Sequence, residues 1–508
     1  ITIPPDSLIG KVEATGPFLN FSMHPQRLAA AVLAEIAACG DGYGQQPDGV
    51  GKLIVVDYSA PNIAKRMHVG HIRSTIIGQS LVNIFRALGH PVVGDNHLGD
   101  WGKQFGVVLA SIAHYGKPGT EGETALEELE EQYKRYSGEM QERPDLDDEA
   151  RSWSLRLEQG DPGARALWQW CVDLTMAAAQ RNYDRLGVHI DHAYGESFYE
   201  DMLPGVIAEA LEKGVAFREE GGAVVIENLD SLPTFLLQRS DGGTLYMTRD
   251  VATVLFRLKE FRPSRLVYVI GEPQALHMRQ LFALTRAMGN APDVGLVHVA
   301  FGTVFDASGQ PLSTRRGNMV YLESLLDEAV ARARAVVEKK SPELPEDEKT
   351  AVSEAVGVGA VVYNDLYQDT KRNITLDWDR MLATDGNSAT YLQYSHARCR
   401  SILRRAEADG SAPSDAARLT HPAETSLITH LARLPEALRE AGSRYAPFVI
   451  ADWCYTTARE FGVFFEQCQV LKAESPELRA SRLSLVAATA HALKAGLGLL
   501  GIRAPERM

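Results

Sequence analysis

The chain has 508 residues, 45% of them hydrophobic and 23% charged, a composition that excludes collagen-like and wholly disordered proteins. This length predicts about three domains. The formal net charge of −14 excludes a global basic field, so a nucleic-acid partner would bind a local basic patch on an acidic body.

Signals for a membrane, a metal or a secreted protein are missing from the sequence. No apolar run reaches about 18 residues, and the start, ITIPPDSLIG, has no signal-peptide pattern. Because that start lacks a Met, we expect that residue 1 is not the biological start. The five cysteines form no CxxC pair, and neither HExxH nor a Walker A loop occurs. We therefore expect a cytoplasmic protein with no membrane span and no protein-bound metal.

The first regular elements alternate between strand and helix. The apolar run 53–57 predicts a buried strand, residues 71–88 predict a helix, and residues 91–98 predict a second strand. Strand, helix and strand in this order begin a parallel α/β sheet. After an interruption, further strands are expected to complete that sheet, at 223–226, 234–237 and 266–270.

Two long stretches of the chain are helical. Residues 121–149 hold twelve acidic and three basic residues, and the helical pattern continues through Leu186, which predicts an insertion with solvated acidic faces. From Tyr321 to the end one helix follows another, with a linker expected at 340–348 and a mobile connection at 406–424.

The segment 57–74, DYSAPNIAKRMHVGHIRS, carries the chemistry. His68 and His71 are three residues apart where the helix begins, so they project from one side of it. Gly70 lets a flat ring approach the backbone, and a helix N-terminus favours phosphate. Imidazoles can donate to phosphate oxygens as charge redistributes in a transition state. The motif predicts an ATP site for attack at the α-phosphate; the alternative is two incidental histidines at a helix start.

Several blocks of the sequence resemble a known family. PNIAKRMHVGH (61–71) and NHLGDWGKQFG (96–106) are similar to class I aminoacyl-tRNA synthetases, specifically the arginyl-tRNA synthetase family of the bacterial type. The similarity continues, in the family's order, through SDGGTLYMTRD (240–250), YLQYSHARCRSILRR (391–405) and LGLLGIRAPERM (497–508). The resemblance implies activation of L-arginine by ATP, with Mg²⁺, to arginyl-adenylate, and its transfer to the 3′-terminal ribose of tRNA(Arg).

The resemblance also implies a nucleotide loop at 311–318, PLSTRRGN. Its expected ATP contacts are Ser313, Thr314, Arg315 and Arg316, and Thr314 stands where the family usually has a lysine. Because transition-state charge still needs a cation, Arg315 and Lys65 are the expected catalytic replacements. For Lys65 the alternative is a surface lysine without a role.

Recognition of arginine requires planar acceptors, ideally a carboxylate. Asp57 ends the first strand, where α/β sheets place ligands, and Asp250 follows Tyr246 by four residues, so these two share a helical face. The alternatives are helix capping for Asp250 and a surface loop position for Gln274. By resemblance, the arginine-binding residues are Asp57, Ser59, Asn62, Tyr246, Asp250 and Gln274.

The C-terminal region resembles the family's anticodon-binding domain. Four arginines within residues 398–405 form a basic patch, and two tyrosines on one helix face could stack on unpaired bases or belong to the core. A second aromatic run, 448–465, is expected to be core. The expected tRNA contacts are Tyr391, Tyr394, Arg398, Arg404, Arg405 and Met508.

The predicted fold class is an α/β Rossmann-like catalytic domain with a parallel sheet and a helical insertion at about 107–210, an all-α C-terminal domain and a partial N-terminal α+β domain. The expected boundaries are 1–50 for a remnant of an N-terminal tRNA-binding domain, 51–320 for the catalytic domain, 321–385 for a helical connection and 386–508 for the anticodon-binding domain. We expect a monomer that binds tRNA(Arg), L-arginine and ATP. The alternatives are a non-catalytic tRNA-binding paralogue and a synthetase-like amino-acid ligase.

Overall fold

A five-stranded parallel sheet lies at the centre of the protein. The computed structural model describes residues 7–312, 320–414 and 418–508. The sheet has the strand order β10-β9-β3-β4-β5, and all of its neighbouring strands are parallel, as the sequence predicted. Its strands are β3 (Ile54–Asp57), β4 (Val92–Leu98), β5 (His192–Gly195), β9 (Arg265–Gly271) and β10 (Gly295–Phe301).

Helices cover both faces of this sheet, which explains why β3 is buried along its whole length. Successive side chains of a strand point to opposite faces. Val56 accordingly packs in one cluster with helix α2 (Val69–Ala87), and Val55 packs in another with helices α8 (Tyr246–Phe261) and α9 (Ala275–Ala287). The carboxyl ends of β3, β4 and β9 therefore meet at the edge where α2 begins.

The prediction that all later strands complete the central sheet was wrong for two of them. Strands β7 (Val224–Ile226) and β8 (Phe235–Gln238) form a separate antiparallel sheet with β6 (Phe217–Arg218). Alternation marks a strand but not its partner, and a short connection favours antiparallel pairing with the nearest strand. The edge strands of the central sheet are instead β5 and β10, neither of which the sequence analysis predicted.

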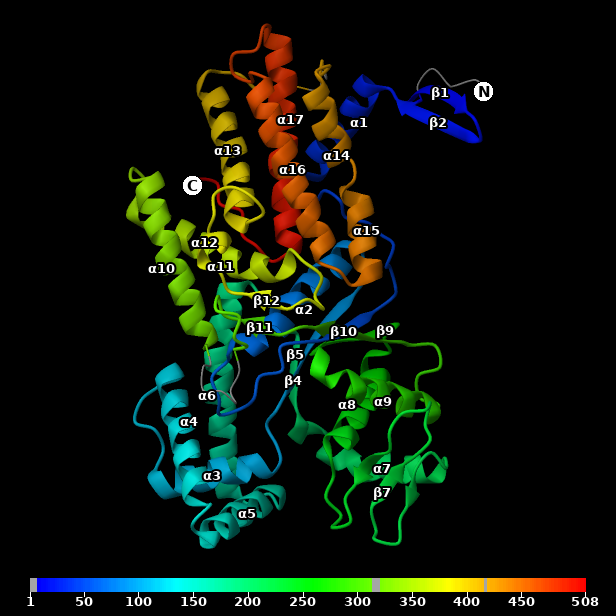
Figure 1. The fold of residues 1–508 in the computed structure, drawn as a ribbon, viewed down its shortest axis with the longest axis vertical. Coiled ribbons are helices and arrows are strands. Elements are labelled where there is room, and N and C mark those ends of the chain that lie inside the picture. Colours follow the sequence, from blue (N-terminus) through cyan, green and yellow to red (C-terminus); the bar gives the residue numbers. More distant parts are fainter. Residues whose placement is uncertain (1–6, 313–319, 415–417) are drawn as a thin grey trace.

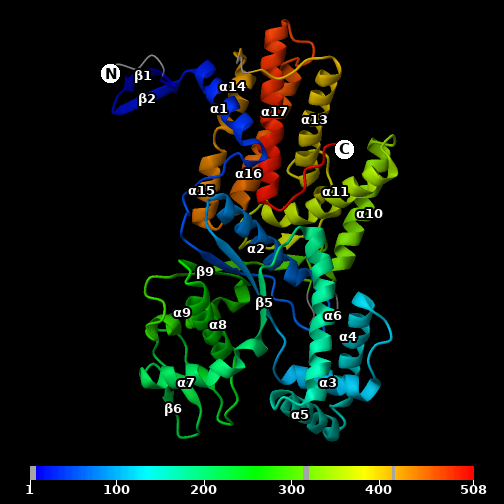
Figure 2. The ribbon, with the colours of Figure 1, turned by 180° about the vertical axis from the view of Figure 1, so that it is seen from behind.

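Two groups of helices extend from the carboxyl edge of the sheet (Figure 1). One is the predicted helical insertion, and seen from behind its longest helix, α6, runs from the level of the sheet down to α3 and α5 (Figure 2). Its helices are α3 (Lys103–Tyr115), α4 (Gly122–Glu139), α5 (Pro144–Glu158) and α6 (Pro162–Leu186). The other group holds η2 (Glu196–Met202), α7 (Leu203–Glu212), α8, η3 (Glu272–Gln274) and α9.

The C-terminal part is a helical bundle on the opposite side of the sheet (Figure 1). Within it, one short parallel pair, β11 (Val304–Phe305) with β12 (Ile374–Thr375), interrupts the predicted succession of helices. The helices are α10 (Leu322–Lys340), α11 (Glu346–Leu366), α12 (Trp378–Met381), α13 (Ala389–Ala408), α14 (Pro422–Leu431), α15 (Leu434–Arg444), α16 (Phe448–Gln467) and α17 (Pro476–Leu499).

The N-terminal part has α+β character, as predicted. An antiparallel pair, β1 (Ile9–Thr15) and β2 (Phe18–Met23), projects from the body (Figures 1 and 2), and every residue of β2 is exposed. Helix α1 (Pro25–Cys39) and the turn η1 (Gly40–Gly42) then pack against the C-terminal bundle. In the part of the chain that the structure describes, no helix is long and apolar enough to cross a membrane.

Candidate functional site

One cavity of about 630 Å³ lies at the carboxyl edge of the central sheet. It gathers residues that are far apart in the sequence, from the end of β3, the start of α2, the start of α8 and the loop after β9. The sequence-predicted residues that line it are Asp57, Ser59, Asn62, His68, Gly70, His71, Tyr246, Asp250 and Gln274.

The two histidines hold each other at the start of α2. His68 is the N-cap residue, and its Nδ1 accepts a hydrogen bond from the Gly70 amide at 3.0 Å, while the His68 amide donates to Nδ1 of His71 at 3.1 Å. A side chain at Gly70 would meet the His68 ring at 2.7 Å, so the glycine makes room for the imidazole itself. The two ring centroids are 4.0 Å apart.

These contacts determine the protonation state of both rings. A ring nitrogen that accepts a backbone N–H carries no proton, so each neutral imidazole keeps its proton on Nε2. Burial lowers the pKa of His71 to about 3, helped by the nearby His68 and Lys65, and burial also lowers the pKa of His68. Both rings are therefore neutral Nε2–H donors near pH 7.

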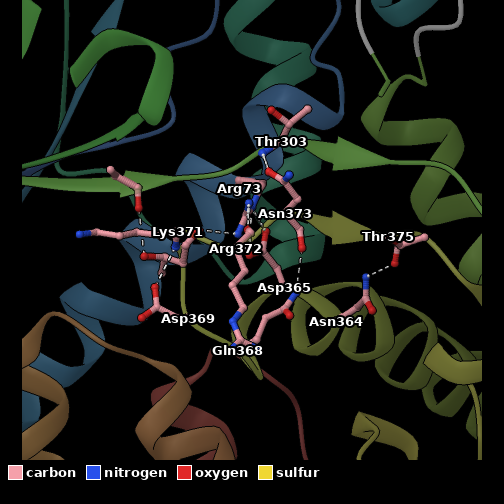
Figure 3. Close-up of polar contacts among 12 residues, drawn as sticks. Arg73, Thr303, Asn364, Asp365, Gln368, Asp369, Lys371, Arg372, Asn373 and Thr375 are labelled. Atoms are coloured by element: carbon pink, nitrogen blue, oxygen red, sulfur yellow. Dashed lines mark hydrogen bonds and ion pairs between the residues drawn. The ribbon is translucent and has the colours of Figure 1, made fainter. Parts of the chain in front are cut away.

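A buried ion pair anchors the histidine helix to the C-terminal part (Figure 3). Arg73, two residues after His71, lies 2.8–3.1 Å from both carboxylate oxygens of Asp365 on α11. Its guanidinium also donates to the carbonyl oxygens of Thr370 and Arg372. Both charged side chains are about 1% exposed, so the start of α2 is held rigidly against α11 and the loop before β12.

The loop after β3 has a strained backbone that other elements hold in place. Ser59 and Ala60 have positive φ angles of 78° and 51°. The Ser59 hydroxyl lies 2.7 Å from that of Tyr183 on α6, and the Ala60 amide donates to Asn96 on β4. Strain of this kind persists where surrounding contacts enforce it. The loop is thus fixed with Ser59 and Asn62 at the wall of the cavity.

The carboxylate of Asp57 is already paired within the protein. Arg257 on α8 lies 2.7 Å from Asp57 and 2.7 Å from Asp95, and all three side chains are buried. The sequence analysis did not predict this arginine, because a basic residue in the middle of a helix gives no sign of its buried partners.

Asp250 lies on the second turn of α8, so it does not cap that helix. Its Oδ2 is 2.5 Å from Nε2 of His277 on α9. Tyr246, one turn earlier, is 63% exposed at the mouth of the cavity, and Gln274 ends η3 just before α9. The predicted alternative of a helix cap for Asp250 therefore does not apply, whereas Gln274 is exposed, as its surface alternative expected, and also borders the cavity.

A second acidic side chain in this cavity, Glu196, was missed by the sequence analysis. Among the described residues no hydrogen-bond partner reaches its Oε2, and the nearest cation, Nη1 of Arg249, is 3.5 Å away. Burial raises the pKa of Glu196 to about 7, and the neighbouring Asp250 and Asp100 carboxylates act in the same direction. The cavity thus has two acidic groups, Asp250 beside His277 and Glu196 in a long ion pair with Arg249.

Of the two predicted replacement cations, Lys65 is not among the residues that line the cavity. The Nζ of Lys65 lies 5.3 Å from the centre of the Tyr133 ring on α4, although its charge helps to lower the pKa of both histidines. Ser313, Thr314, Arg315 and Arg316 lie outside the described residues. Within the described ranges, no group of three or more His, Cys, Asp or Glu side chains is arranged to hold a metal ion.

A separate cavity of about 670 Å³ lies on the C-terminal bundle between α13, α16 and the end of the chain. Four of the residues predicted to contact tRNA line it, namely Tyr394, Arg398, Arg405 and Met508. The Arg398 guanidinium lies 4.7 Å from the Tyr394 ring and 5.0 Å from the Phe465 ring, both of which are substantially exposed. Phe465 is therefore the exception in an aromatic run that was expected to be core.

The other two predicted contacts lie elsewhere on α13. Tyr391 is half-buried and donates to the Ala458 carbonyl at 3.3 Å, in agreement with the core alternative. Arg404 faces the C-terminal tail, where it donates to the Glu506 carbonyl at 2.9 Å.

Two family models match the chain and together cover most of it. Residues 36–378 match the model described as tRNA synthetases class I (R), catalytic domain, and residues 392–508 match the DALR anticodon binding domain. A curated arginine–tRNA ligase from Chloroflexus aurantiacus is 70% identical over 100% of this chain and 89% of its own length. The corresponding protein from Edwardsiella ictaluri is 40% identical over 99% of this chain and 88% of its own length.

Solved structures agree in fold. The arginyl-tRNA synthetase of Thermus thermophilus superimposes with a TM-score of 0.84 at 24% identity, covering 99% of this chain and 89% of that one. The enzyme of the same name from Plasmodium falciparum gives a TM-score of 0.82 at 25% identity, with coverage of 99% and 86%. On its sequence, its fold and the histidine-lined cavity at its sheet edge, the chain belongs to the class I arginyl-tRNA synthetase family.

Proposed function

We propose that the protein is an arginine–tRNA ligase, which activates L-arginine with ATP and transfers it to the terminal ribose of tRNA(Arg). The observation that carries this proposal is that one cavity is lined both by two neutral histidines and by the acidic residues Asp250 and Glu196. A phosphate-binding helix start and a negatively charged pocket together suit a substrate with a guanidinium at one end and a carboxylate at the other.

Asp250 and Glu196 are the groups best placed to receive the guanidinium. Asp57 is paired with Arg257, so its charge is largely compensated before substrate arrives. His277 holds the Asp250 carboxylate in place, and Tyr246 and Gln274 border the same space. In this pose Asp57, Ser59 and Asn62 form the wall along the rest of the arginine.

The arginine carboxylate then points toward ATP at the start of α2. A carboxylate oxygen attacks the α-phosphorus, arginyl-adenylate forms and pyrophosphate leaves. The Nε2–H groups of His68 and His71 donate to phosphate oxygens whose charge grows in the transition state, and Gly70 leaves room for the nucleotide. Ser313, Thr314, Arg315, Arg316 and Lys65 are proposed as the remaining groups near ATP. Mg²⁺ arrives with ATP, held by phosphate and water.

A terminal ribose hydroxyl of tRNA(Arg) next attacks the adenylate carbonyl carbon, and AMP leaves. On the C-terminal bundle, Tyr394, Arg398, Arg405 and Met508 form a wall that suits unpaired bases and their phosphates. Tyr391 and Arg404 support that wall through Ala458 and Glu506. A monomer, a cytoplasmic location and the domain boundaries given above complete the proposal.

The test is a comparison of the twenty amino acids in ATP–pyrophosphate exchange and in charging of a bulk tRNA pool. The proposal predicts that arginine alone supports both reactions well. Charging with another amino acid would contradict the specificity, whereas tRNA binding without exchange or charging would support the non-catalytic alternative. Exchange with arginine but transfer only to a small molecule would support the amino-acid ligase alternative.

A further inference from the structure

One acidic residue of the helical insertion is buried against the histidine motif. Residues 121–149 carry twelve acidic side chains, and the sequence analysis expected all of them to be solvated. Glu130 on α4 departs from this expectation, because its side chain is only 10% exposed. A buried carboxylate in an otherwise solvated acidic helix requires specific partners, because an unpaired buried charge is costly.

The partners of Glu130 come from two distant parts of the chain. Its Oε1 accepts the backbone amide of Arg66 at 2.7 Å, and its Oε2 lies 3.2 Å from the Arg66 guanidinium. The same Oε2 accepts the hydroxyl of Tyr321 at 2.8 Å. The guanidinium carbon also lies over the Tyr321 ring, 3.5 Å from its centre. Glu130 therefore closes a three-residue cluster, defined as Glu130, Arg66 and Tyr321.

Both Arg66 and Tyr321 belong to segments of the chain that adjoin His68. Arg66 is two residues before His68, and His68 and Tyr321 face each other in an antiparallel bridge. Hydrogen bonds flank that bridge, from the Val69 amide to the Val320 carbonyl at 3.0 Å and from the Leu322 amide to the Met67 carbonyl at 2.9 Å. The backbone of His68 is thus held from one side by the bridge and from the other by Glu130 through Arg66.

We propose that Glu130 is a positioning residue for adenylate formation, which acts by fixing His68 and Tyr321 relative to each other from the helical insertion. This inference rests on the proposed function, because its kinetic test measures adenylate formation from arginine and ATP. Glu130 touches neither the cavity nor a reacting atom; it acts through the Arg66 amide and the Tyr321 hydroxyl. Small displacements of a catalytic group lower kcat strongly. The arginine-binding groups Asp250 and Glu196 stand on other elements, α8 and η2, and keep their places.

Helix α4 offers a matched control for this inference. Glu127, one turn before Glu130, forms an ion pair with the same Arg66 guanidinium at 3.0 Å, but its side chain is 50% exposed. The structure gives it no bond to the Arg66 amide or the Tyr321 hydroxyl among the described contacts. Glu127→Gln therefore removes a charge near Arg66 without removing the contacts that define the cluster.

The experiment compares arginine-dependent ATP–pyrophosphate exchange of the full chain with that of Glu130→Gln, Tyr321→Phe, their double variant and Glu127→Gln. We expect Glu130→Gln to lower kcat about tenfold or more, with the KM for arginine within about twofold of wild type. Tyr321→Phe should lower kcat in the same way but less. The double variant should be no worse than Glu130→Gln, because both changes break one shared bond. Glu127→Gln should stay within about twofold of wild type.

Each of these kinetic results would overturn the inference: equal effects of Glu130→Gln and Glu127→Gln, a parallel loss of kcat and arginine affinity, or effects of the two single changes that multiply. If Glu130→Gln fails to fold, Tyr321→Phe decides alone, and an unchanged kcat in that variant counts against the inference.

Hydrogen exchange adds a readout that needs no activity. Glu130→Ala should speed the hydrogen exchange of the backbone amides of residues 66–69, and Glu127→Ala should not. Equal protection of these amides in the two variants would overturn the inference. A wild-type chain without exchange activity both in the absence and in the presence of tRNA(Arg) would instead contradict the proposed function.

Discussion

The carboxylate of Asp57 lies 2.7 Å from the guanidinium of Arg257, where the wall of the cavity meets the buried core. The acidic group that ends β3 is therefore matched by the protein's own arginine. Two acidic residues of the cavity, Asp250 and Glu196, are left to receive the guanidinium of a substrate, and this division of roles can be tested residue by residue.

Asp250→Asn should raise the KM for arginine by about 10- to 100-fold, because it removes one of the charges that face the guanidinium. The KM for ATP should change little, since the histidine pair is untouched. Asp57→Asn should instead lower the melting temperature, because it leaves Arg257 buried with one acidic partner. Steady-state exchange kinetics and thermal unfolding measure both effects. If Asp57→Asn lowered the affinity for arginine without lowering the melting temperature, Asp57 would bind substrate rather than serve as the partner of Arg257.

The pH dependence of arginine binding should follow Glu196. Its pKa is raised from 4.5 to about 7, so the arginine-free protein holds a proton in this pH range that the unfolded chain releases. The stability that this group contributes is fully present below about pH 4.5 and is lost as the pH rises through about 7. A bound guanidinium favours the ionised carboxylate, so the KM for arginine should fall about tenfold between pH 6 and 8. Glu196→Gln should flatten that profile, and an unchanged slope would exclude this role.

His68→Ala and His71→Ala should each lower kcat for exchange by about 100-fold, the typical cost of losing one preorganised donor to a developing charge. Because the pKa of His71 is about 3, its protonation should leave no step in the kcat profile between pH 5 and 8. The affinity for tRNA, measured by filter binding, should be unchanged. A comparable loss of tRNA binding would show that the histidines act on structure rather than on charge.

Asp365→Asn should destabilise the protein by about 3 to 5 kcal/mol, because it leaves the Arg73 guanidinium buried with only carbonyl partners. Denaturant unfolding monitored by intrinsic fluorescence measures this loss. Since Arg73 anchors the start of α2, the exchange kcat should fall as well. A stable Asp365→Asn protein with normal kcat would mean that the ion pair neither stabilises the fold nor positions α2.

Arg405→Gln should weaken tRNA binding and reduce the slope of log K against log salt by about 0.7 to 0.9, the value expected for one lost phosphate contact. Arginine KM should stay constant, because the cavity on α13 is separate from the one at the sheet edge. Arg444→Gln on α15 is the matched control, since that arginine is exposed and does not line either cavity. Equal slopes for the two variants would exclude a phosphate contact by Arg405.

Local sequence signals predicted the elements that depend on local physics. The apolar run of β3 was sufficient to predict the start of the sheet, and the motif around His68 and His71 placed the start of α2 within two residues of its observed position. Strand β5 was missed because its sequence, HAYG, contains no apolar run, and only its last residue is buried. The partners of β7 and β8 were missed because pairing is not encoded in the alternation of a single strand.

The site residues that belong to a sequence motif could be predicted, whereas those that only burial brings to the site could not. Asp250 and Gln274 were found through the resemblance, and both line the cavity. Glu196, Arg257 and Glu130 are ordinary charged residues in the sequence, and only the fold brings each to a buried partner or to the cavity. A single sequence contains no signal that separates such residues from solvated ones.

The most direct measurement is a crystal structure of the protein with L-arginine bound. We predict that the guanidinium lies within hydrogen-bond distance of Asp250 and Glu196 and that the substrate carboxylate faces His68 and His71. Arginine bound at another place, or in the cavity with its carboxylate toward Asp250, would contradict the account.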